Sequence, residues 1–92
     1  MQIHIKYFAQ IKSKAGKSSE VLELENGATL QGCIKKLSKE NDHGINDILY
    51  DESGVYRDAV ILVINSQQTR YAENPKMNDG DELMIMSPIA GG

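Results

Sequence analysis

The residues with the clearest chemical potential are the last two of the sequence, Gly91 and Gly92. Glycine has no Cβ, so this pair fits a narrow channel in another protein, and no side chain hinders attack on the terminal carboxylate. A carboxylate is ionised at neutral pH and is a poor electrophile until a partner activates it. We expect Gly92 to carry the reactive group, and Gly91, Ala90, Ile89 and Pro88 to contact the activating partner.

Pro88 also separates the end of the chain from the body. Its ring removes the backbone N–H that strand pairing needs and keeps Ser87 extended. We therefore expect residues 1–86 to form the folded domain and residues 87–92 to form a flexible Gly-Gly tail. Gly91 and Gly92 are expected to be disordered in the free protein, because neither carries a side chain that packs.

Other nucleophiles and bases in the sequence do not assemble into a catalytic set. A serine or cysteine nucleophile needs a base, and the two histidines are His4, on the polar face of a predicted strand, and His43, in a predicted loop. The sole cysteine, Cys33, falls on the apolar stripe of a predicted helix, where a thiolate is disfavoured. A phosphate-binding loop is absent from the sequence as well. A separate enzyme is therefore expected to activate the chain, and a thiol-dependent enzyme that uses Cys33 is an alternative.

Two further groups of charged residues have a structural and a functional interpretation. Asp79 and Asp81 flank Gly80, a pattern that marks a turn more often than a metal site, because it offers only two hard ligands. We predict no metal site and no cofactor bound by the chain itself. Two basic clusters are either solvated faces or a docking patch for an acidic partner. They consist of Lys12, Lys14 and Lys17, and of Lys35, Lys36 and Lys39.

Length and charge exclude several classes of protein. The chain has 92 residues, which suits one domain with little interior for a deep catalytic pocket. Ten Lys and Arg against 13 Asp and Glu leave a net charge of −3, so nucleic acid is not expected as the main ligand. The longest apolar run, residues 59–64, is too short to cross a membrane, and the start lacks a signal-peptide pattern. One cysteine cannot form an internal disulfide, so we expect a soluble cytoplasmic protein.

The first half of the sequence predicts two strands and a helix. Apolar and polar residues alternate over residues 2–8, as in a half-buried strand that turns Ile3, Ile5 and Tyr7 inward. A polar turn at residues 14–18 leads to a second strand, paired with the first as a hairpin. Thr29 caps a helix whose apolar residues recur at helical spacing. They are Leu30, Cys33, Ile34 and Leu37, while Lys35, Lys36 and Lys39 are expected to face water.

The second half predicts loops and three more strands. Residues 41–58 carry turn signals and at most one turn of helix. Residues 59–64 form a nearly continuous apolar run, which favours a central strand buried on both faces. A short strand near residues 68–71 and a loop at 72–81 precede a last strand, Glu82–Met86. This order predicts an α+β domain in which one main helix packs across a mixed sheet, the pattern of the ubiquitin-like β-grasp fold.

The last strand carries the other candidate contact residues. Its side chains alternate, so either Leu83 and Ile85 or Met84 and Met86 face inward. Methionine adapts to irregular apolar pockets and is frequent at surfaces that bind more than one partner. We expect Met84 and Met86 to bind partner proteins beside the tail, and the alternative is that they fill the core.

Both ends of the sequence resemble the MoaD family, the small sulfur-carrier subunit of molybdopterin synthase. Residues 78–92, NDGDELMIMSPIAGG, are similar to that family's ending, and residues 6–11, KYFAQI, followed by Ala15-Gly16, are similar to its opening. The thiamine carrier ThiS shares the fold and the Gly-Gly pair, and small archaeal ubiquitin-like modifiers have nearly the same tail. The sequence departs from the family at Ser87, where a proline is common, and at Met84 and Met86, where aromatics are common. It is also longer than a short MoaD at residues 42–58.

The resemblance implies a chemical cycle at Gly92. An adenylating enzyme of the MoeB, ThiF or ubiquitin-activating type would consume ATP and form an acyl adenylate, and sulfur from a persulfide would then displace AMP. The resulting thiocarboxylate would give its sulfur to a pterin precursor in MoaE, the large synthase subunit, during molybdenum cofactor biosynthesis. If the chain is instead a protein modifier, a lysine of a target protein attacks the adenylate and forms an isopeptide bond. A thiamine-type sulfur carrier and a plain interaction domain are two further hypotheses, and in each the chain is a carrier or partner and not itself an enzyme.

Overall fold

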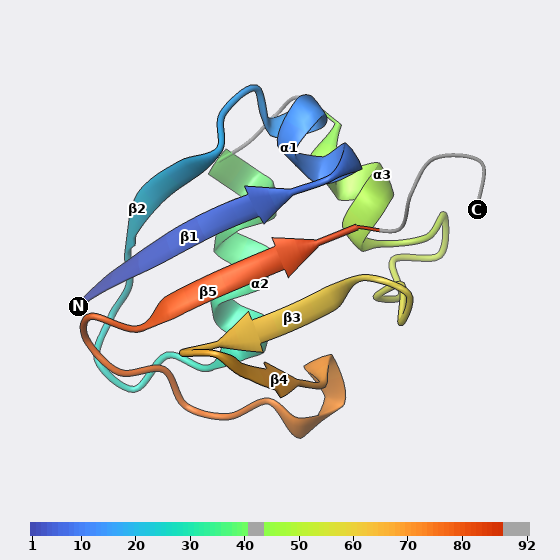
Figure 1. The fold of residues 1–92 in the computed structure, drawn as a ribbon. Helices are drawn as coiled ribbons and strands as arrows, with labels where there is room; N and C mark the ends of the chain where they lie inside the picture. Colours follow the sequence, from blue (N-terminus) through green and yellow to red (C-terminus); the bar gives the residue numbers. More distant parts are fainter. Residues whose placement is uncertain (41–43, 88–92) are drawn as a thin grey trace.

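The computed structural model describes residues 1–40 and 44–87, which form a mixed sheet with helices on one face (Figure 1). The elements in chain order are β1 Gln2–Phe8, α1 Gln10–Ala15, β2 Ser19–Glu23, α2 Leu30–Glu40, α3 Ile45–Leu49, β3 Ile61–Ile64, β4 Gln67–Thr69, the 3₁₀ turn η1 Tyr71–Glu73, and β5 Glu82–Met86. The strands lie in the order β2-β1-β5-β3-β4. Among the described strands, only the β1–β5 pair is parallel. The predicted α+β class, with one main helix across a mixed sheet, is confirmed.

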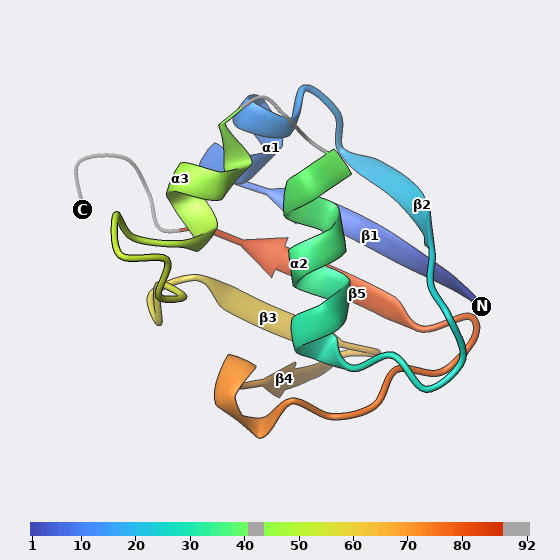
Figure 2. The same ribbon diagram turned by 180° about the vertical axis from the view of Figure 1, so that it is seen from behind.

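The alternation in β1 decides which face of the sheet is covered. Ile3, Ile5 and Tyr7 are buried, as predicted, and the intervening residues are exposed. Viewed from behind, α2 crosses this buried face, and α1 and α3 lie over the end toward which β1 and β5 point (Figure 2). The opposite face of the sheet has no helix over it within the described residues. We call this uncovered side the open face.

Helix α2 is the predicted amphipathic helix. Its apolar residues Leu30, Cys33, Ile34 and Leu37 are all fully buried. Lys35 and Lys39 are exposed as predicted. Lys36 differs, because it is only half-exposed and its ammonium donates to the main-chain carbonyl of Glu23. A long lysine stem near the sheet edge packs its methylenes while the charged end finds an acceptor.

Helix α1 was not expected, because the sequence predicted only a polar turn in this region. Its buried residues are Ile11 and Ala15, a single i, i+4 pair that is too short to establish a helical period. The helix is followed by Gly16, whose φ of +73° is the left-handed conformation that glycine commonly adopts after a helix. Residue Ala9, before the helix, also has a positive φ, +61°.

The prediction for residues 59–64 was wrong in two respects. The strand β3 begins only at Ile61, and Ile61 is 38% exposed, so the strand is not buried on both faces. It is also not the central strand, since β5 lies in the middle of the sheet. An apolar run is typical of two-sided burial, but here the outward residues Ile61 and Val63 belong to the open face instead.

The remaining segments follow the sequence with smaller differences. The single helical turn expected within residues 41–58 is α3, whose Ile45 and Leu49 are fully buried. The strand expected at residues 68–71 is shorter and shifted: β4 ends at Thr69, and Tyr71 begins a 3₁₀ turn. The Tyr71 ring stacks on Tyr56, with 4.0 Å between ring centroids. None of the helices in residues 1–40 and 44–87 combines the length and the apolar character that crossing a membrane requires.

Candidate functional site

Met86 and Ser87 are the last residues that the structure describes, and we call them the tail root. Strand β5 ends at Met86, between Phe8 of β1 and Ile61 of β3. Ser87 follows and is only 3% exposed, and its Oγ accepts the main-chain N–H of Ile11 at 2.8 Å. Ser87, the first residue of the expected tail, is therefore packed against the body of the domain. The predicted contact residues Pro88, Ile89, Ala90 and Gly91, and the reactive Gly92, lie outside the described residues.

Beside this root, the open face of the sheet carries a group of apolar side chains. Leu83 and Ile85 are fully buried, so Met84 and Met86 point away from the helices, with Met86 36% exposed. Their strand neighbours share this face, because directly opposed residues in a sheet project to the same side. We call the five residues Phe8, Ile61, Val63, Met84 and Met86 the outer patch. The sequence left open whether the methionines fill the core, and the structure places them outside it.

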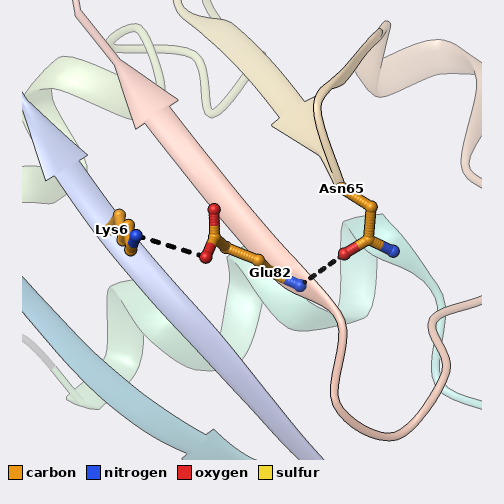
Figure 3. A network of polar contacts seen from close by, with 3 residues as sticks. All are labelled: Lys6, Asn65 and Glu82. Atoms are coloured by element: carbon orange, nitrogen blue, oxygen red, sulfur yellow. Dashed lines mark hydrogen bonds and ion pairs between the residues drawn. The ribbon is translucent and has the colours of Figure 1, made fainter.

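An ion pair borders the outer patch on the side of β1. Lys6 Nζ lies 3.2 Å from Glu82 Oε2, and Lys6 is opposite Met84 in the strand register. Figure 3 shows that the Glu82 main-chain N–H also donates to Asn65 Oδ1, at 2.9 Å. An exposed pair of this kind contributes less than about 1 kcal/mol to stability. Apolar residues with a polar border are nevertheless the usual anatomy of a protein-binding surface.

The acidic residues around Gly80 build a turn, as the structural interpretation predicted. Asp79 Oδ1 accepts the Gln2 N–H at 2.7 Å. Asp81 is buried, and its two carboxylate oxygens accept from Asn65 Nδ2 at 2.8 Å and from the Asn78 N–H at 2.7 Å. These bonds hold the start of β5 beside the start of β1. Across residues 1–40 and 44–87, no cluster of three His, Cys, Asp or Glu side chains could hold a metal ion.

The remaining candidates for chemistry do not form a catalytic centre in the described part of the chain. Cys33 is fully buried, and burial raises the pKa of its thiol to about 12, so the thiol stays protonated at neutral pH. His4 is exposed on the open face, at the end of the sheet away from Met86, and His43 lies outside the described residues. An open hollow of about 820 Å³ lies between α2 and residues 50–54. The described residues that line it include no cysteine or histidine, and the Ser38 hydroxyl donates to the Lys35 carbonyl.

The two basic clusters are partly used in local contacts. Lys17 Nζ lies 3.6 Å from Glu20 Oε1, and Lys36 bonds the Glu23 carbonyl. Lys12, Lys35 and Lys39 are exposed on α1 and α2. These lysines lie on the helix side of the molecule, away from the outer patch. The solvated-face interpretation therefore accounts for what the structure shows of them.

Comparison with known protein families identifies the family to which this chain belongs. The model of the ThiS family matches residues 5–92. The chain belongs to the ThiS family. This confirms the resemblance that both ends of the sequence indicated.

The curated relatives of this ThiS-family chain match it along its whole length. The molybdopterin synthase sulfur carrier subunit of Chlamydomonas reinhardtii is 24% identical over 92 residues and is covered completely, as is this chain. Small archaeal modifier protein 3 of Haloferax volcanii is 22% identical over 94 residues, again with complete coverage of both chains. The family is therefore one of ubiquitin-like sulfur carriers and modifiers.

Solved structures of similar proteins establish the fold of this ThiS-family chain. The crystal structure of SAMP1 from Haloferax volcanii has a TM-score of 0.89 at 20% identity and covers 100% of both chains. A chain in the BexX/CysO complex of Amycolatopsis orientalis has a TM-score of 0.68 at 23% identity, with 98% of this chain and 99% of that chain covered. The predicted ubiquitin-like β-grasp fold is confirmed.

Sequence reasoning missed part of the candidate site. Phe8, Ile61 and Val63 were not proposed as contact residues, because Ile61 and Val63 belong to the run that was interpreted as buried on both sides. The signal that could have found them is the register: once β3 is placed antiparallel to β5, Ile61 faces Met86 and Val63 faces Met84. The bond between Ser87 and Ile11 joins residues 76 apart and leaves no local pattern in the sequence.

Proposed function

We propose that this chain is a sulfur carrier for molybdopterin synthesis, activated at the carboxylate of Gly92 by a separate adenylating enzyme. The observation that carries the proposal is the family match, which extends through Gly92 and so includes the Gly-Gly pair. A full-length relative named as a molybdopterin synthase sulfur carrier subunit supports the pathway. The tail expected at residues 87–92 would present the carboxylate to that enzyme.

The chemistry has three balanced steps. The Gly92 carboxylate attacks the α-phosphate of ATP, releasing pyrophosphate and forming an acyl adenylate. The terminal sulfur of a persulfide then attacks the acyl carbon, and AMP leaves with the electron pair of the broken C–O bond. A second thiol cleaves the S–S bond of the acyl persulfide, which yields a disulfide and the free thiocarboxylate. The partner enzymes supply ATP binding, the persulfide and the second thiol.

The outer patch is the proposed docking surface for the adenylating enzyme. It starts at Met86, next to the root of the tail, so an enzyme that holds Gly92 in its active site lies within reach of this surface. Its apolar side chains are at least partly accessible, and the Lys6–Glu82 pair supplies a polar border. Methionine side chains adapt to more than one partner, which suits a carrier that also visits a large synthase subunit of the MoaE type.

A protein modifier is the second candidate function, and the full-length likeness to small archaeal modifier protein 3 supports it. The first step is the same adenylation. A lysine amine of a target protein then attacks the acyl carbon, AMP leaves, and an isopeptide bond forms in place of the thiocarboxylate. A thiamine-type sulfur carrier shares the route to the thiocarboxylate with the molybdopterin proposal and differs only in the acceptor.

The test is to incubate the chain with its adenylating enzyme, ATP and a persulfide source, and to weigh the product by mass spectrometry. We expect a gain equal to the exchange of one oxygen for one sulfur at Gly92. Deletion of Gly92 should abolish the gain, because the carboxylate of Gly91 then ends up to about 3.5 Å short of the active site. One added residue should also abolish it, because misplacement of the reacting atom by about 1 Å can cost 100-fold in rate.

The same experiment separates the two functions. A search of cell lysate for lysines that bear a Gly-Gly remnant detects conjugation, and thiocarboxylate without such lysines supports the carrier alone. A product with unchanged mass, under conditions in which a known carrier reacts, together with no conjugated lysines, would contradict both functions and favour a plain interaction domain.

A further inference from the structure

Ser87 makes an unusual contact for a residue at the start of a tail. It is 3% exposed, and its hydroxyl oxygen accepts the N–H of Ile11 at 2.8 Å. Ile11 is the second residue of α1, so its N–H is one of the donors that a helix leaves without an internal partner at its beginning. A distant serine therefore fills the role that an N-cap side chain usually has.

The local sequence does not supply that cap. Ala9 occupies the N-cap position and has no side chain that accepts a hydrogen bond. Its backbone is also in an unfavourable conformation, with φ +61° and ψ −139°. Non-glycine residues adopt positive φ only where the surrounding structure enforces it, and such strain is concentrated at functional sites. The strained residue, the first turn of α1 and Ser87 meet where β5 ends.

We infer that Ser87 is a positioning residue for the tail, acting through its bond to the Ile11 N–H, an inference that rests on the proposed function. The bond fixes the point from which residues 88–92 begin. Five residues span at most about 17 Å, so the position of Ser87 limits where the Gly92 carboxylate can go. Ser87 directly follows Met86 of the outer patch. An enzyme bound to the outer patch would therefore find the Gly92 carboxylate within about 17 Å of Ser87.

Loss of the Ser87 hydroxyl should affect the reaction and not the docking. Without the bond, the backbone at the root gains freedom that must be lost again when the tail enters the enzyme. Ordering the backbone of one residue corresponds to a rate loss of about 5- to 30-fold. The outer patch keeps its residues in such a variant, so affinity for the enzyme should be unchanged.

The test compares Ser87→Ala, Ser87→Thr and Ser13→Ala in the full chain. Ser13 lies exposed on α1, so Ser13→Ala makes the same chemical change without touching the root. Initial rates of pyrophosphate release, measured at a fixed temperature against carrier concentration, separate kcat from KM. We expect Ser87→Ala to lower kcat by about 5- to 30-fold at unchanged KM. Ser87→Thr, which keeps a hydroxyl, and Ser13→Ala should stay within about twofold of the wild type.

The outcomes separate this inference from the proposed function. A Ser87→Ala kcat within about twofold of wild type overturns the inference, and so does a Ser87→Thr loss as large as that of Ser87→Ala. Hydrogen exchange of the Ile11 amide can be measured in the wild-type chain alone. We expect slow exchange, because this N–H is hydrogen-bonded to Ser87. Exchange at the rate of an unstructured peptide would contradict that hydrogen bond and overturn the inference. If the wild-type chain is not adenylated at all, the proposed function fails and this inference with it.

Discussion

At the scale of single residues, burial determines what Cys33 does. The thiol lies among Leu30, Ile34 and Leu37 on the inner side of α2, and its pKa is raised to about 12 because desolvation penalises the thiolate. The nearby Lys36 lowers this pKa but does not outweigh burial. A protonated thiol is neither a nucleophile nor a metal ligand at neutral pH, so Cys33 belongs to the core.

The raised pKa predicts how stability depends on pH. The folded chain holds the Cys33 proton above the ordinary pKa of 9.0, so the free energy of unfolding is unaffected by this group below about pH 9 and falls from there toward pH 12. The fall amounts to at most about 1.4 kcal/mol per pH unit. The pKa values of Tyr50 and Tyr56 are also raised by burial, so these groups add to the fall above their ordinary value of 10.0. Urea unfolding between about pH 8 and pH 11 measures it.

The matched control for this pH dependence is Cys33→Ala. We expect this variant to be less stable than the wild type by about 1 kcal/mol below about pH 9. It should lack the decline between about pH 9 and pH 10, where cysteine is the first of the three groups to titrate, so the difference should shrink there. Stability profiles of equal slope in the two proteins over that interval would contradict the assignment. Thiocarboxylate formation should survive the substitution, since the proposed cycle needs no sulfur from Cys33.

At the scale of elements, the start of α2 is stabilised by residues from two parts of the chain. The Leu30 N–H donates to the Pro75 carbonyl at 2.8 Å, and the Gln31 N–H donates to Asn74 Oδ1 at 2.9 Å. Thr29 Oγ1 accepts the Gly32 N–H at 3.3 Å, as the predicted cap should. The helix that covers the sheet is thus tied to the loop that precedes β5.

Thr29→Ala should therefore lower the free energy of unfolding by about 1 kcal/mol, because one N–H at the start of α2 loses its acceptor. Thr29→Ser keeps the oxygen and is the control, which we expect to stay within about 0.5 kcal/mol of the wild type. Urea denaturation of the three proteins measures the difference. Equal stability of the alanine and serine variants would show that the hydroxyl does not cap the helix.

Two glycines in the helical elements should respond in opposite directions to the same substitution. Gly16 follows α1 with φ +73°, so Gly16→Ala should cost about 1 kcal/mol through backbone strain, although the added Cβ has no described atom within 4 Å beyond Gly16 and its chain neighbours. Gly32 has ordinary helical backbone, and an added Cβ would meet Thr29 Oγ1 at 3.6 Å, a normal contact. Gly32→Ala should stabilise the protein by about 0.4–1 kcal/mol. Thermal unfolding of both variants checks the signs, and a shift of both in the same direction would contradict this explanation.

At the scale of the whole molecule, the fold separates two faces with different tasks. The helices α1, α2 and α3 cover one side of the sheet and bury the core between them. The other side carries the outer patch and its polar border. Strand β5 runs through the middle of the sheet and ends at the tail root. The proposed docking surface and the proposed reactive end of the chain therefore adjoin one strand.

The outer patch predicts a change in partner affinity without a change in fold. Met84→Asp and Met86→Asp should each weaken binding to the adenylating enzyme by at least about tenfold, since a buried carboxylate without a partner is costly in an apolar interface. Val21→Asp is the matched control, because Val21 is 52% exposed and opposite His4 at the other end of the open face. Calorimetric titration gives the three affinities, and circular dichroism checks the fold. Equal affinities for all three variants would place the docking surface elsewhere.

Local patterns in the sequence determined several elements by themselves. The alternation in β1 and the i, i+3, i+4, i+7 spacing of Leu30 to Leu37 each identify a buried face, because a strand and a helix repeat their side-chain direction over a few residues. The bounds of β5 were predicted correctly. The Gly-Gly end and the similarity at both termini pointed to the family before any fold was known.

The tertiary structure decided what no local pattern records. The strand order places β5 and not β3 at the centre, so the apolar run at residues 59–64 supplies an exposed face to the outer patch. Helix α1 forms although its own sequence offers one apolar pair and an uncapped start. Its Ile11 and Ala15 pack in the core, and Ser87 accepts the Ile11 N–H from a distant part of the sequence. Contacts between residues 76 apart depend on how the sheet assembles, and the identity of neighbouring residues does not specify that assembly.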